Sequence, residues 1–297
     1  MVSRRIVIAS LMSSAATGAC GTTGAPSAAL PRATPAPSPV SANSSESAVA
    51  RTPLPLADPK EVVVFAASSL TTVFDQLWST FKAQRGNGGL ALTTNYGASS
   101  QLRAQLQEGA SADVFASADT AQMELAAKAG LIDGESRIFA RNRLVVIVPR
   151  ANPGKVRSVA DLGRPGLKFV TAPADVPIGG YTRTALKKLA SHTANGEGFE
   201  AKVLANVVSE EVNVRHVVAK VQLGEADAGI CYATDVTTVP AGDVTSIDIP
   251  DEANVVAEYP IAVLKSARNA ATARQLIAFI VSPSGQAVLE AAKFKPA

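Results

Sequence analysis

From Lys60 to the C-terminus, short apolar runs alternate with longer segments in which apolar residues recur at the helical period. Glycine follows three of the helical segments, at Gly86, Gly109 and Gly130, where the end of a helix favours a residue that tolerates positive φ. This alternation predicts an α/β fold with largely parallel sheets. The expected strands are 62–65, 90–95, 113–116, 144–148, 168–171, 228–232 and 261–264.

The order of these runs suggests two lobes of similar construction. A turn closes the strand at 144–148, a new series of strands and helices follows, and the last strand, 261–264, comes late in the chain. We therefore assign residues 60–143 and 236–297 to the first lobe and residues 144–235 to the second. This arrangement predicts a cleft between the lobes, where strand-to-helix junctions of the two sheets face each other.

The N-terminal residues have the order of an export signal. Arg4 and Arg5 precede an apolar run that is too short to span a bilayer, and small residues follow it, so residues 1–19 are expected to be a signal peptide. Residues 20–59 are rich in Ser, Ala, Pro and Thr and lack large apolar side chains. Such a segment cannot bury enough apolar surface to order itself, and it predicts a flexible tether.

The residues around the expected cleavage point resemble a bacterial lipobox. Gly18 and Ala19 precede Cys20, which in that pattern becomes the acylated first residue of the mature protein. Thr17 departs from the leucine that is usual there. The alternative is ordinary cleavage after Ala19, which would release a secreted protein without a lipid anchor.

Composition and charge exclude several classes of function. The chain of 297 residues is 47% hydrophobic, which is enough for a substantial core. Its net charge is +3 with the basic residues scattered, so we expect no nucleic-acid partner. Cys20 and Cys231 lie far apart, and the two histidines, His192 and His216, lie in separate segments. We therefore expect no disulfide framework, no cation-binding metal site and no Ser-His relay.

Two serines stand at equivalent strand-to-helix junctions of the first lobe. Ser69 follows the strand 62–65, and Ser99 follows the strand 90–95. Adjacent parallel strands place such junctions side by side, and the free N–H groups of helix N-termini bind anions. The two serines are therefore candidates for an anion site. The alternative is that each serine only caps its helix.

Four segments, in this order and spacing, resemble the periplasmic molybdate-binding proteins of molybdenum ABC importers. They are FAASSLTTVFDQL, NYGASSQLRAQLQEGASADVFASAD, DVPIGGYTRTAL and AGICYATD. The resemblance extends from about Glu61 to near the C-terminus. It implies a two-lobed, type II periplasmic solute-binding protein fold that closes on tetrahedral molybdate or tungstate, with a ligand cleft between the lobes.

The resemblance also implies which residues bind the ligand. The hydroxyl and backbone donors of the first lobe fall on Ser69 and Ser99. The backbone N–H donors of the second lobe fall on Ile178 and Val214, and a tyrosine hydroxyl falls on Tyr232. Ile178 departs from the alanine common at its position, although a backbone contact would survive this change. Without the resemblance, Ile178, Val214 and Tyr232 would be interpreted as core or packing residues.

This set of donors contains hydroxyls and amides and no charged side chain. A carboxylate would help to bind a protonated phosphate but would repel a fully ionised molybdate, tungstate or sulfate. The first alternative is therefore the same fold binding sulfate, thiosulfate or another oxyanion. The second is an enzyme on this fold, of the tetrapyrrole-forming or dehydratase kind. The tetrapyrrole-forming kind would need a cofactor-bearing cysteine, which Cys231 in an apolar strand does not offer.

The resemblance implies a substrate-binding component that delivers its ligand to the permease of a molybdenum ABC importer. No cofactor other than the molybdate or tungstate ligand is expected. The protein is expected to be an exported monomer, held on the outer face of the membrane only by a lipid on Cys20, or free if that cysteine is not acylated.

Overall fold

The computed structural model describes residues 60–85, 89–192 and 195–297, which belong to one compact unit, Leu54–Ala297. The expected signal peptide, Cys20 and the expected tether up to residue 59 lie outside the described residues. In the described part of the chain, no helix is long and apolar enough to cross a membrane.

The first lobe begins with three strand-to-helix units and ends with a long strand. Its elements are β1 (Glu61–Ala67), the 3₁₀ helix η1 (Ser68–Leu70), α1 (Thr71–Arg85), β2 (Ala91–Gly97), α2 (Ser99–Gln107), β3 (Val114–Ala116), α3 (Thr120–Lys128) and β4 (Ile132–Asn142). The apolar stripe that begins in η1 and continues along α1 is buried against this sheet. Its side chains are 0 to 2% exposed: Leu70, Val73, Phe74, Leu77 and Phe81.

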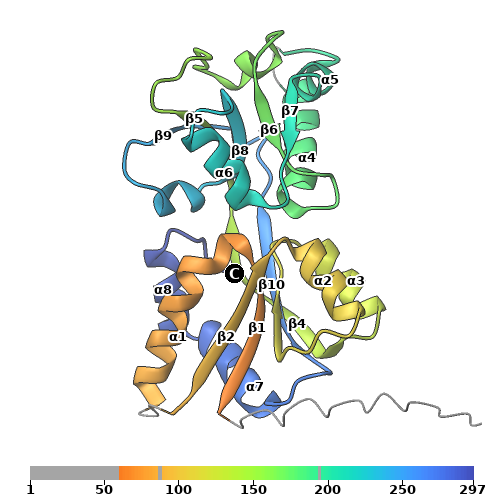
Figure 1. Cartoon of the computed structure of the whole chain (residues 1–297), viewed down its shortest axis with the longest axis vertical. Coiled ribbons are helices and arrows are strands. Elements are labelled where there is room, and N and C mark those ends of the chain that lie inside the picture. Colours follow the sequence, from red (N-terminus) through yellow and green to blue (C-terminus); the bar gives the residue numbers. More distant parts are fainter. Residues whose placement is uncertain (1–59, 86–88, 193–194) are drawn as a thin grey trace, which may run out of the picture. The chain divides into compact units, whose positions relative to one another are not determined.

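The chain then builds the second lobe and returns to the first. The elements of the second lobe are β5 (Leu144–Pro149), η2 (Val159–Gly163), β6 (Phe169–Thr171), α4 (Pro177–His192), α5 (Phe199–Leu204), β7 (Val207–Glu210), α6 (Val214–Gln222), β8 (Ala228–Tyr232), η3 (Asp235–Thr238) and β9 (Val244–Asp248). The returning elements are β10 (Ala257–Leu264), α7 (Ala270–Ile280) and α8 (Pro283–Ala291) (Figure 1).

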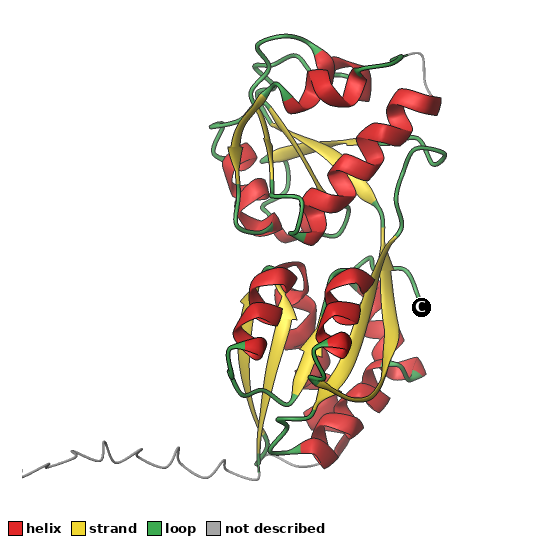
Figure 2. Ribbon diagram, turned by 90° about the vertical axis from the view of Figure 1, so that its right-hand side faces the viewer, coloured by secondary structure: helices red, strands yellow, loops and turns green. Residues whose placement is uncertain are grey.

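Each lobe contains a five-stranded sheet, and the two sheets have equivalent strand orders. The first is β2-β1-β3-β10-β4 and the second is β7-β6-β8-β5-β9. Helices flank both sheets (Figure 2). The prediction of two similar lobes, with the chain leaving the first and returning to it, is confirmed.

The expectation of largely parallel sheets needs correction, because both sheets are mixed. In each sheet the fourth strand, β10 or β5, runs antiparallel to both of its neighbours. The physical reason is the connection: parallel neighbours in a sheet require a crossover segment, usually a helix, whereas β10 and β5 enter directly from the other lobe. Only Arg143 separates β4 from β5.

Three strands were not expected from the sequence: β4, β7 and β9. Strand β9 pairs with β5, so the second lobe extends beyond residue 235, where the sequence analysis had ended it. The pattern gave no signal because these strands lack apolar runs. Much of β4 and three of the five residues of β9 are exposed.

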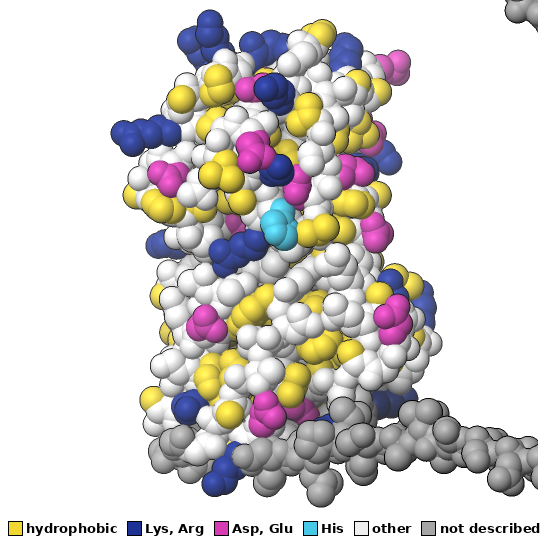
Figure 3. Space-filling view, viewed as in Figure 1, with side chains coloured by type: hydrophobic (Ala, Val, Ile, Leu, Met, Phe, Trp, Pro, Cys, Tyr) yellow, Lys and Arg dark blue, Asp and Glu magenta, His cyan; other side chains and the backbone are white. Residues whose placement is uncertain are grey.

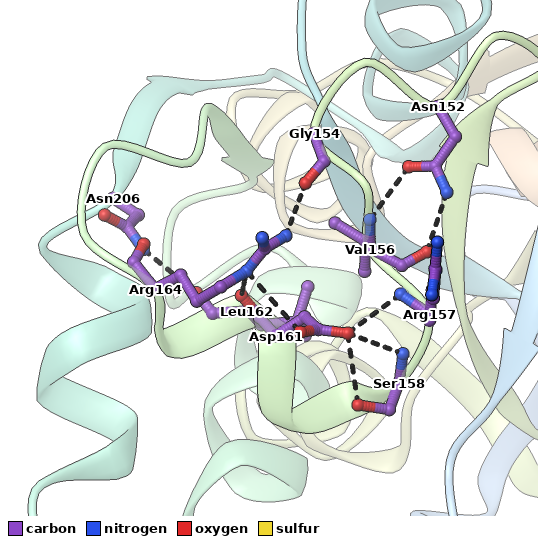
Figure 4. Close-up of polar contacts among 9 residues, drawn as sticks. All are labelled: Asn152, Gly154, Val156, Arg157, Ser158, Asp161, Leu162, Arg164 and Asn206. Carbon is purple, nitrogen blue, oxygen red and sulfur yellow. Dashed lines mark hydrogen bonds and ion pairs between the residues drawn. The ribbon is translucent and has the colours of Figure 1, made fainter.

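One loop of the second lobe is fixed by its own polar contacts (Figure 4). The Asn152 side chain accepts from the Val156 N–H at 2.9 Å and donates to the Val156 carbonyl at 2.8 Å. The Asp161 carboxylate accepts from the N–H groups of Arg157 and Ser158. These hydrogen bonds, led by the one from Arg157, lower the pKa of Asp161. The loop is therefore ordered without a large apolar core of its own.

Candidate functional site

A small cavity lies between the two lobes. The first lobe contributes Ala67, Ser68, Ser69, Gly97, Ala98, Ser99 and Ala118, and the second contributes Val176, Pro177, Ile178, Asn213, Val214 and Tyr232. All five residues expected to bind a ligand are in this lining. The space accessible to the centre of a water molecule is about 10 Å³, which excludes a sugar or peptide in this conformation.

The cavity lining contains no acidic side chain, no basic side chain and no histidine. On the face of the molecule drawn in Figure 3, Lys and Arg side chains are interspersed with Asp and Glu side chains. A charged guest in the cavity would therefore have to be bound by neutral donors and local dipoles.

Strand pairing brings the two serine junctions of the first lobe together. Strands β1 and β2 are parallel neighbours, and the last residues of each, Ala67 and Gly97, are partners in register. Ser69 lies in η1 directly after β1, and Ser99 is the first residue of α2. Both are buried, with exposures of 4% and 1%. The sequence argument for their convergence is confirmed by this register.

Neither serine caps a helix, so the alternative interpretation of these residues is wrong. The N-cap positions are Ala67 for η1 and Ala98 for α2, and neither alanine has a side chain that could accept a hydrogen bond. The first N–H groups of α2 are therefore left without a side-chain cap, and Ser99, the first residue of the helix, lines the cavity. The Ser99 Oγ accepts a hydrogen bond from the Ala118 N–H at 3.0 Å, which orients the hydroxyl.

The N-terminus of α6 in the second lobe leaves one amide for a ligand. The Asn213 side chain caps this helix by accepting from the N–H groups of Arg215, at 2.9 Å, and His216, at 3.3 Å. The Val217 N–H donates to the Asn213 carbonyl. Of the first four amides of α6, these contacts leave the N–H of Val214, which lines the cavity.

Helix α4 presents its N-terminus to the same cavity. Its first residue, Pro177, has no N–H, and the Gly180 N–H donates to the Val176 carbonyl. The amides of Ile178 and Gly179 are therefore the free donors of this first turn. Ile178 is 2% exposed and belongs to the core, as its apolar character predicts, and it also lines the cavity.

Tyr232 ends strand β8 and carries the most informative atom of the site. Its side chain is 1% exposed, and its hydroxyl has no hydrogen-bond partner among the described residues. Edge-to-face contacts with Tyr181 and Tyr259 hold the ring, with centroids 6.3 and 5.7 Å away. Burial raises the pKa of Tyr232 well above its ordinary value, so the hydroxyl stays protonated and can donate. A buried, unpartnered donor is costly, and a ligand that accepts from it removes this cost.

Four residues near the cavity were missed by the sequence analysis: Asn213, Arg215, Asp235 and Tyr259. Asn213 could have been found, since it immediately precedes a valine-striped helix and asparagine is a preferred N-cap. Tyr259 could not, because it comes from the returning strand β10. Its hydroxyl lies 3.2 Å from the Ser69 Oγ and connects this serine with the packed aromatic side chains between the lobes.

Asp235 is a fully buried carboxyl group directly behind Tyr232. Its Oδ2 accepts from the Tyr232 N–H at 3.1 Å, and its Oδ1 has no partner among the described residues. Burial raises the pKa of Asp235 to about 7, against weaker opposing effects of that hydrogen bond and of the Arg215 charge. The group is therefore largely protonated below neutral pH.

Asp235 is expected to make the free energy of unfolding decrease as the pH rises from about 4 to about 7. In this window the folded protein binds the proton and the unfolded chain does not, so raising the pH favours unfolding. The Asp235→Asn variant lacks this contribution, and urea unfolding should show it gaining stability relative to the natural protein between pH 5 and pH 8. If the difference in the free energy of unfolding between the two proteins were the same at pH 5 and at pH 8, the raised pKa of Asp235 would be contradicted.

Comparison with known proteins places this architecture in a family. The sequence matches the bacterial extracellular solute-binding proteins over residues 62–295. The molybdate-binding protein ModA of Mycobacterium tuberculosis H37Rv is 43% identical over 235 residues, which cover 79% of this chain and 84% of that protein. The chain belongs to the ModA family of extracellular solute-binding proteins. The resemblance inferred from the four sequence segments is thereby confirmed.

Two solved structures with much lower sequence identity share the ModA-family fold. The periplasmic molybdate-binding protein of Azotobacter vinelandii matches with a TM-score of 0.67 at 23% identity, covering 80% of this chain and 99% of that one. The sulfate-binding protein SubI of M. tuberculosis H37Rv matches with a TM-score of 0.72 at 19% identity, covering 80% and 87%. The two-lobed solute-binding fold is therefore confirmed, and the fold by itself does not distinguish between these two oxyanions.

Proposed function

We propose that this ModA-family protein binds molybdate or tungstate in the interlobe cavity and delivers the anion to the membrane permease of an ABC transporter. The observation that carries the proposal is the Tyr232 hydroxyl, a protonated and buried donor without a partner among the described residues, in a cavity where helix N-termini from both lobes meet. The proposed ligand contacts are the hydroxyl and backbone donors of Ser69 and Ser99, the amides of Ile178 and Val214, and the Tyr232 hydroxyl.

The chemistry of these donors favours a fully ionised oxyanion. Each proposed contact offers a hydrogen and none requires the ligand to donate one. Hydrogen bonds to an ionised acceptor are shorter and stronger than neutral ones, and exclusion of water strengthens them further. A protonated phosphate would bring a donor to a lining without a carboxylate to accept it, so phosphate is disfavoured.

Molybdate and tungstate are favoured over sulfate by the 43% identity to the M. tuberculosis ModA protein. Sulfate also presents four acceptor oxygens, and it remains the second candidate because the sulfate-binding protein SubI has the same fold. Selection among these anions would depend on the size of the closed cavity rather than on the kind of donor.

We assign the protein no catalytic role and no cofactor. The family consists of solute-binding proteins. The cysteine that a tetrapyrrole-forming enzyme would need is also unsuitable here, since Cys231 is 0% exposed and burial raises the pKa of its thiol well above the ordinary value. A buried and protonated thiol is a poor nucleophile and a poor attachment point.

The proposed location follows from the family and from the N-terminal sequence. Extracellular solute-binding proteins act outside the cytoplasm, and we propose that a lipid on Cys20 holds this one at the outer face of the membrane. Residues 20–59 would then link the anchor to a monomeric binding domain that meets the permease. Mass spectrometry of the membrane fraction would show diacylglycerol on Cys20, whereas cleavage without a lipid would leave the protein in the soluble fraction.

Thermal unfolding with different anions tests the proposed ligand. A ligand at a hundredfold excess over its dissociation constant should stabilise the folded protein by about 2.7 kcal/mol. Molybdate and tungstate are expected to raise the unfolding temperature of the purified protein, while phosphate at the same concentration and ionic strength is not. A shift with sulfate or phosphate and none with molybdate or tungstate would refute the assignment.

A further inference from the structure

Arg215 connects the two lobes beside the proposed anion site. It is the second residue of α6 in the second lobe, and α6 packs against η1 of the first lobe. Its Nε donates to the Ser68 carbonyl at 3.1 Å, and its Nη2 donates to the Thr72 Oγ1 at 3.1 Å. Both acceptors belong to the first lobe. The side chain therefore spans the gap between the lobes with two hydrogen bonds.

The guanidinium is also fixed on the second lobe. Its Nη1 donates to the Thr238 Oγ1 at 3.3 Å, and the Thr238 hydroxyl in turn donates to the Asp235 carbonyl. The planar group thus contacts η1, α1 and η3 from its position on α6. Lysine could not reproduce this, because an ammonium group is a single point of charge and lacks the fixed fork of donors.

These contacts lie next to the residues that would hold the anion. Arg215 follows Val214 in the chain, and Ser68 precedes Ser69; Val214, Ser68 and Ser69 all line the cavity. Arg215 forms no ion pair with the described residues, so its acceptors on the first lobe are neutral and are exchanged for water when the lobes separate. Opening the cavity requires breaking both of its interlobe hydrogen bonds.

Another interlobe hydrogen bond lies near the start of α4. The Gln122 Nε2 in α3 of the first lobe donates to the Asp175 carbonyl of the second at 3.0 Å, and the Arg103 Nε holds the Gln122 Oε1 at 2.7 Å. This contact uses a neutral amide, which makes a weaker hydrogen bond than a charged guanidinium does. The contact at Arg215 is therefore stronger than the one at Gln122. A further hydrogen bond between the lobes, from the Asn142 Nδ2 to the Thr234 Oγ1 at 2.8 Å, lies next to Arg143.

We propose that Arg215 is a positioning residue that holds the two lobes closed over the bound anion and thereby sets its rate of release. The proposal rests on the proposed function for the ligand, while the interlobe contacts of Arg215 are made by residues of this chain alone. A latch of this kind acts after the anion has entered. Its loss should speed dissociation far more than it slows association, which a residue needed only for folding would not do.

Dissociation of radiolabelled molybdate into excess unlabelled molybdate tests the proposal on the full-length protein. The Arg215→Met variant, which keeps much of the apolar stem, is expected to release the anion at least about tenfold faster, with association changed by no more than about threefold. The dissociation rate of Arg215→Lys should lie between those of the natural protein and of Arg215→Met. Arg274→Met is the matched control, because Arg274 pairs with Asp133 within the first lobe. An unchanged dissociation rate in Arg215→Met, or equal effects on both rates, would overturn the latch.

A measurement without ligand separates this proposal from the assignment of the anion. Spin labels at Ser136→Cys and Lys155→Cys, exposed positions on the first and second lobes, would report the distance between the lobes. Cys20→Ser removes the other labelling site, and Cys231 is buried. Arg215→Met is expected to lengthen this distance or broaden its distribution. If the natural protein does not bind molybdate, the proposed function is wrong. Independently of that result, an unaltered interlobe distance in Arg215→Met would overturn the latch.

Discussion

Replacing Tyr232 by phenylalanine is expected to weaken molybdate binding while stabilising the ligand-free protein. The variant lacks a buried donor to a charged ligand, which costs about 1.5 to 3 kcal/mol of binding, or about ten- to 150-fold in the dissociation constant. The same hydroxyl has no hydrogen-bond partner among the described residues, so its removal also abolishes a desolvation penalty of about 1 to 3 kcal/mol. Calorimetric titration and urea unfolding of the same samples would measure the two effects.

This prediction is specific because affinity for molybdate should fall while the free energy of unfolding should rise. Tyr96→Phe serves as the control, because the Tyr96 hydroxyl donates to Asp75 and the residue is not part of the cavity lining. Its affinity for molybdate should remain that of the natural protein. If Tyr232→Phe lost both affinity and stability, the hydroxyl would have a structural partner in the protein, and its proposed role as a donor to the ligand would be wrong.

Gly179→Ala is expected to have the largest effect on folding and on binding together. A Cβ at this position would lie 2.0 Å from the Pro173 carbonyl oxygen and 2.4 Å from the Ala172 carbonyl oxygen. Both are backbone atoms, so the start of α4 has to move and carries the Ile178 amide with it. Overpacking of this kind costs about 1 to 3 kcal/mol or more, and the displaced amide should weaken molybdate binding by at least about tenfold.

The neighbouring glycine provides a control in the same turn of the same helix. A Cβ at Gly180 would meet only the Ala174 carbonyl oxygen, at 3.1 Å, which a small shift relieves. Alanine also has the higher helix propensity, so Gly180→Ala should be close to neutral. Thermal unfolding and molybdate titration of both variants would compare them. Equal behaviour of the two would show that the close packing of α4 on residues 172–173 does not position the amide.

The sequence predicted most of the fold where burial is one-sided or complete. The strand at Val62, the stripe from Leu70 to Phe81 and the short strand at Ala228 have apolar patterns strong enough to identify them, and the structure confirms all three. Strands β4 and β9 escaped because their residues face solvent over much of their length. An edge strand held by backbone hydrogen bonds leaves little trace in the hydrophobic pattern.

The candidate site was predictable to a different extent in each lobe. Ser69 and Ser99 could be derived from helix-end physics and parallel strand order alone. Ile178, Val214 and Tyr232 look like core residues in the sequence, and only the family resemblance pointed to them. The physical reason is that Ile178 and Val214 would act through backbone amides, which carry no side-chain signature. Arg215 and Tyr259 depend on contacts between segments far apart in the chain, and local patterns cannot reveal them.

The two chain segments that link the lobes differ greatly in length, and this difference constrains how the protein can open. One connection consists of Arg143 alone, while the other runs from Ile249 to Val256. A single residue can change its backbone dihedral angles, but it cannot extend. The lobes are therefore unable to move apart along the line that joins them, and opening has to be a rotation with its pivot close to Arg143. Residues far from this pivot would travel furthest, so the rim of the cleft opposite Arg143 is where an entering anion first finds access.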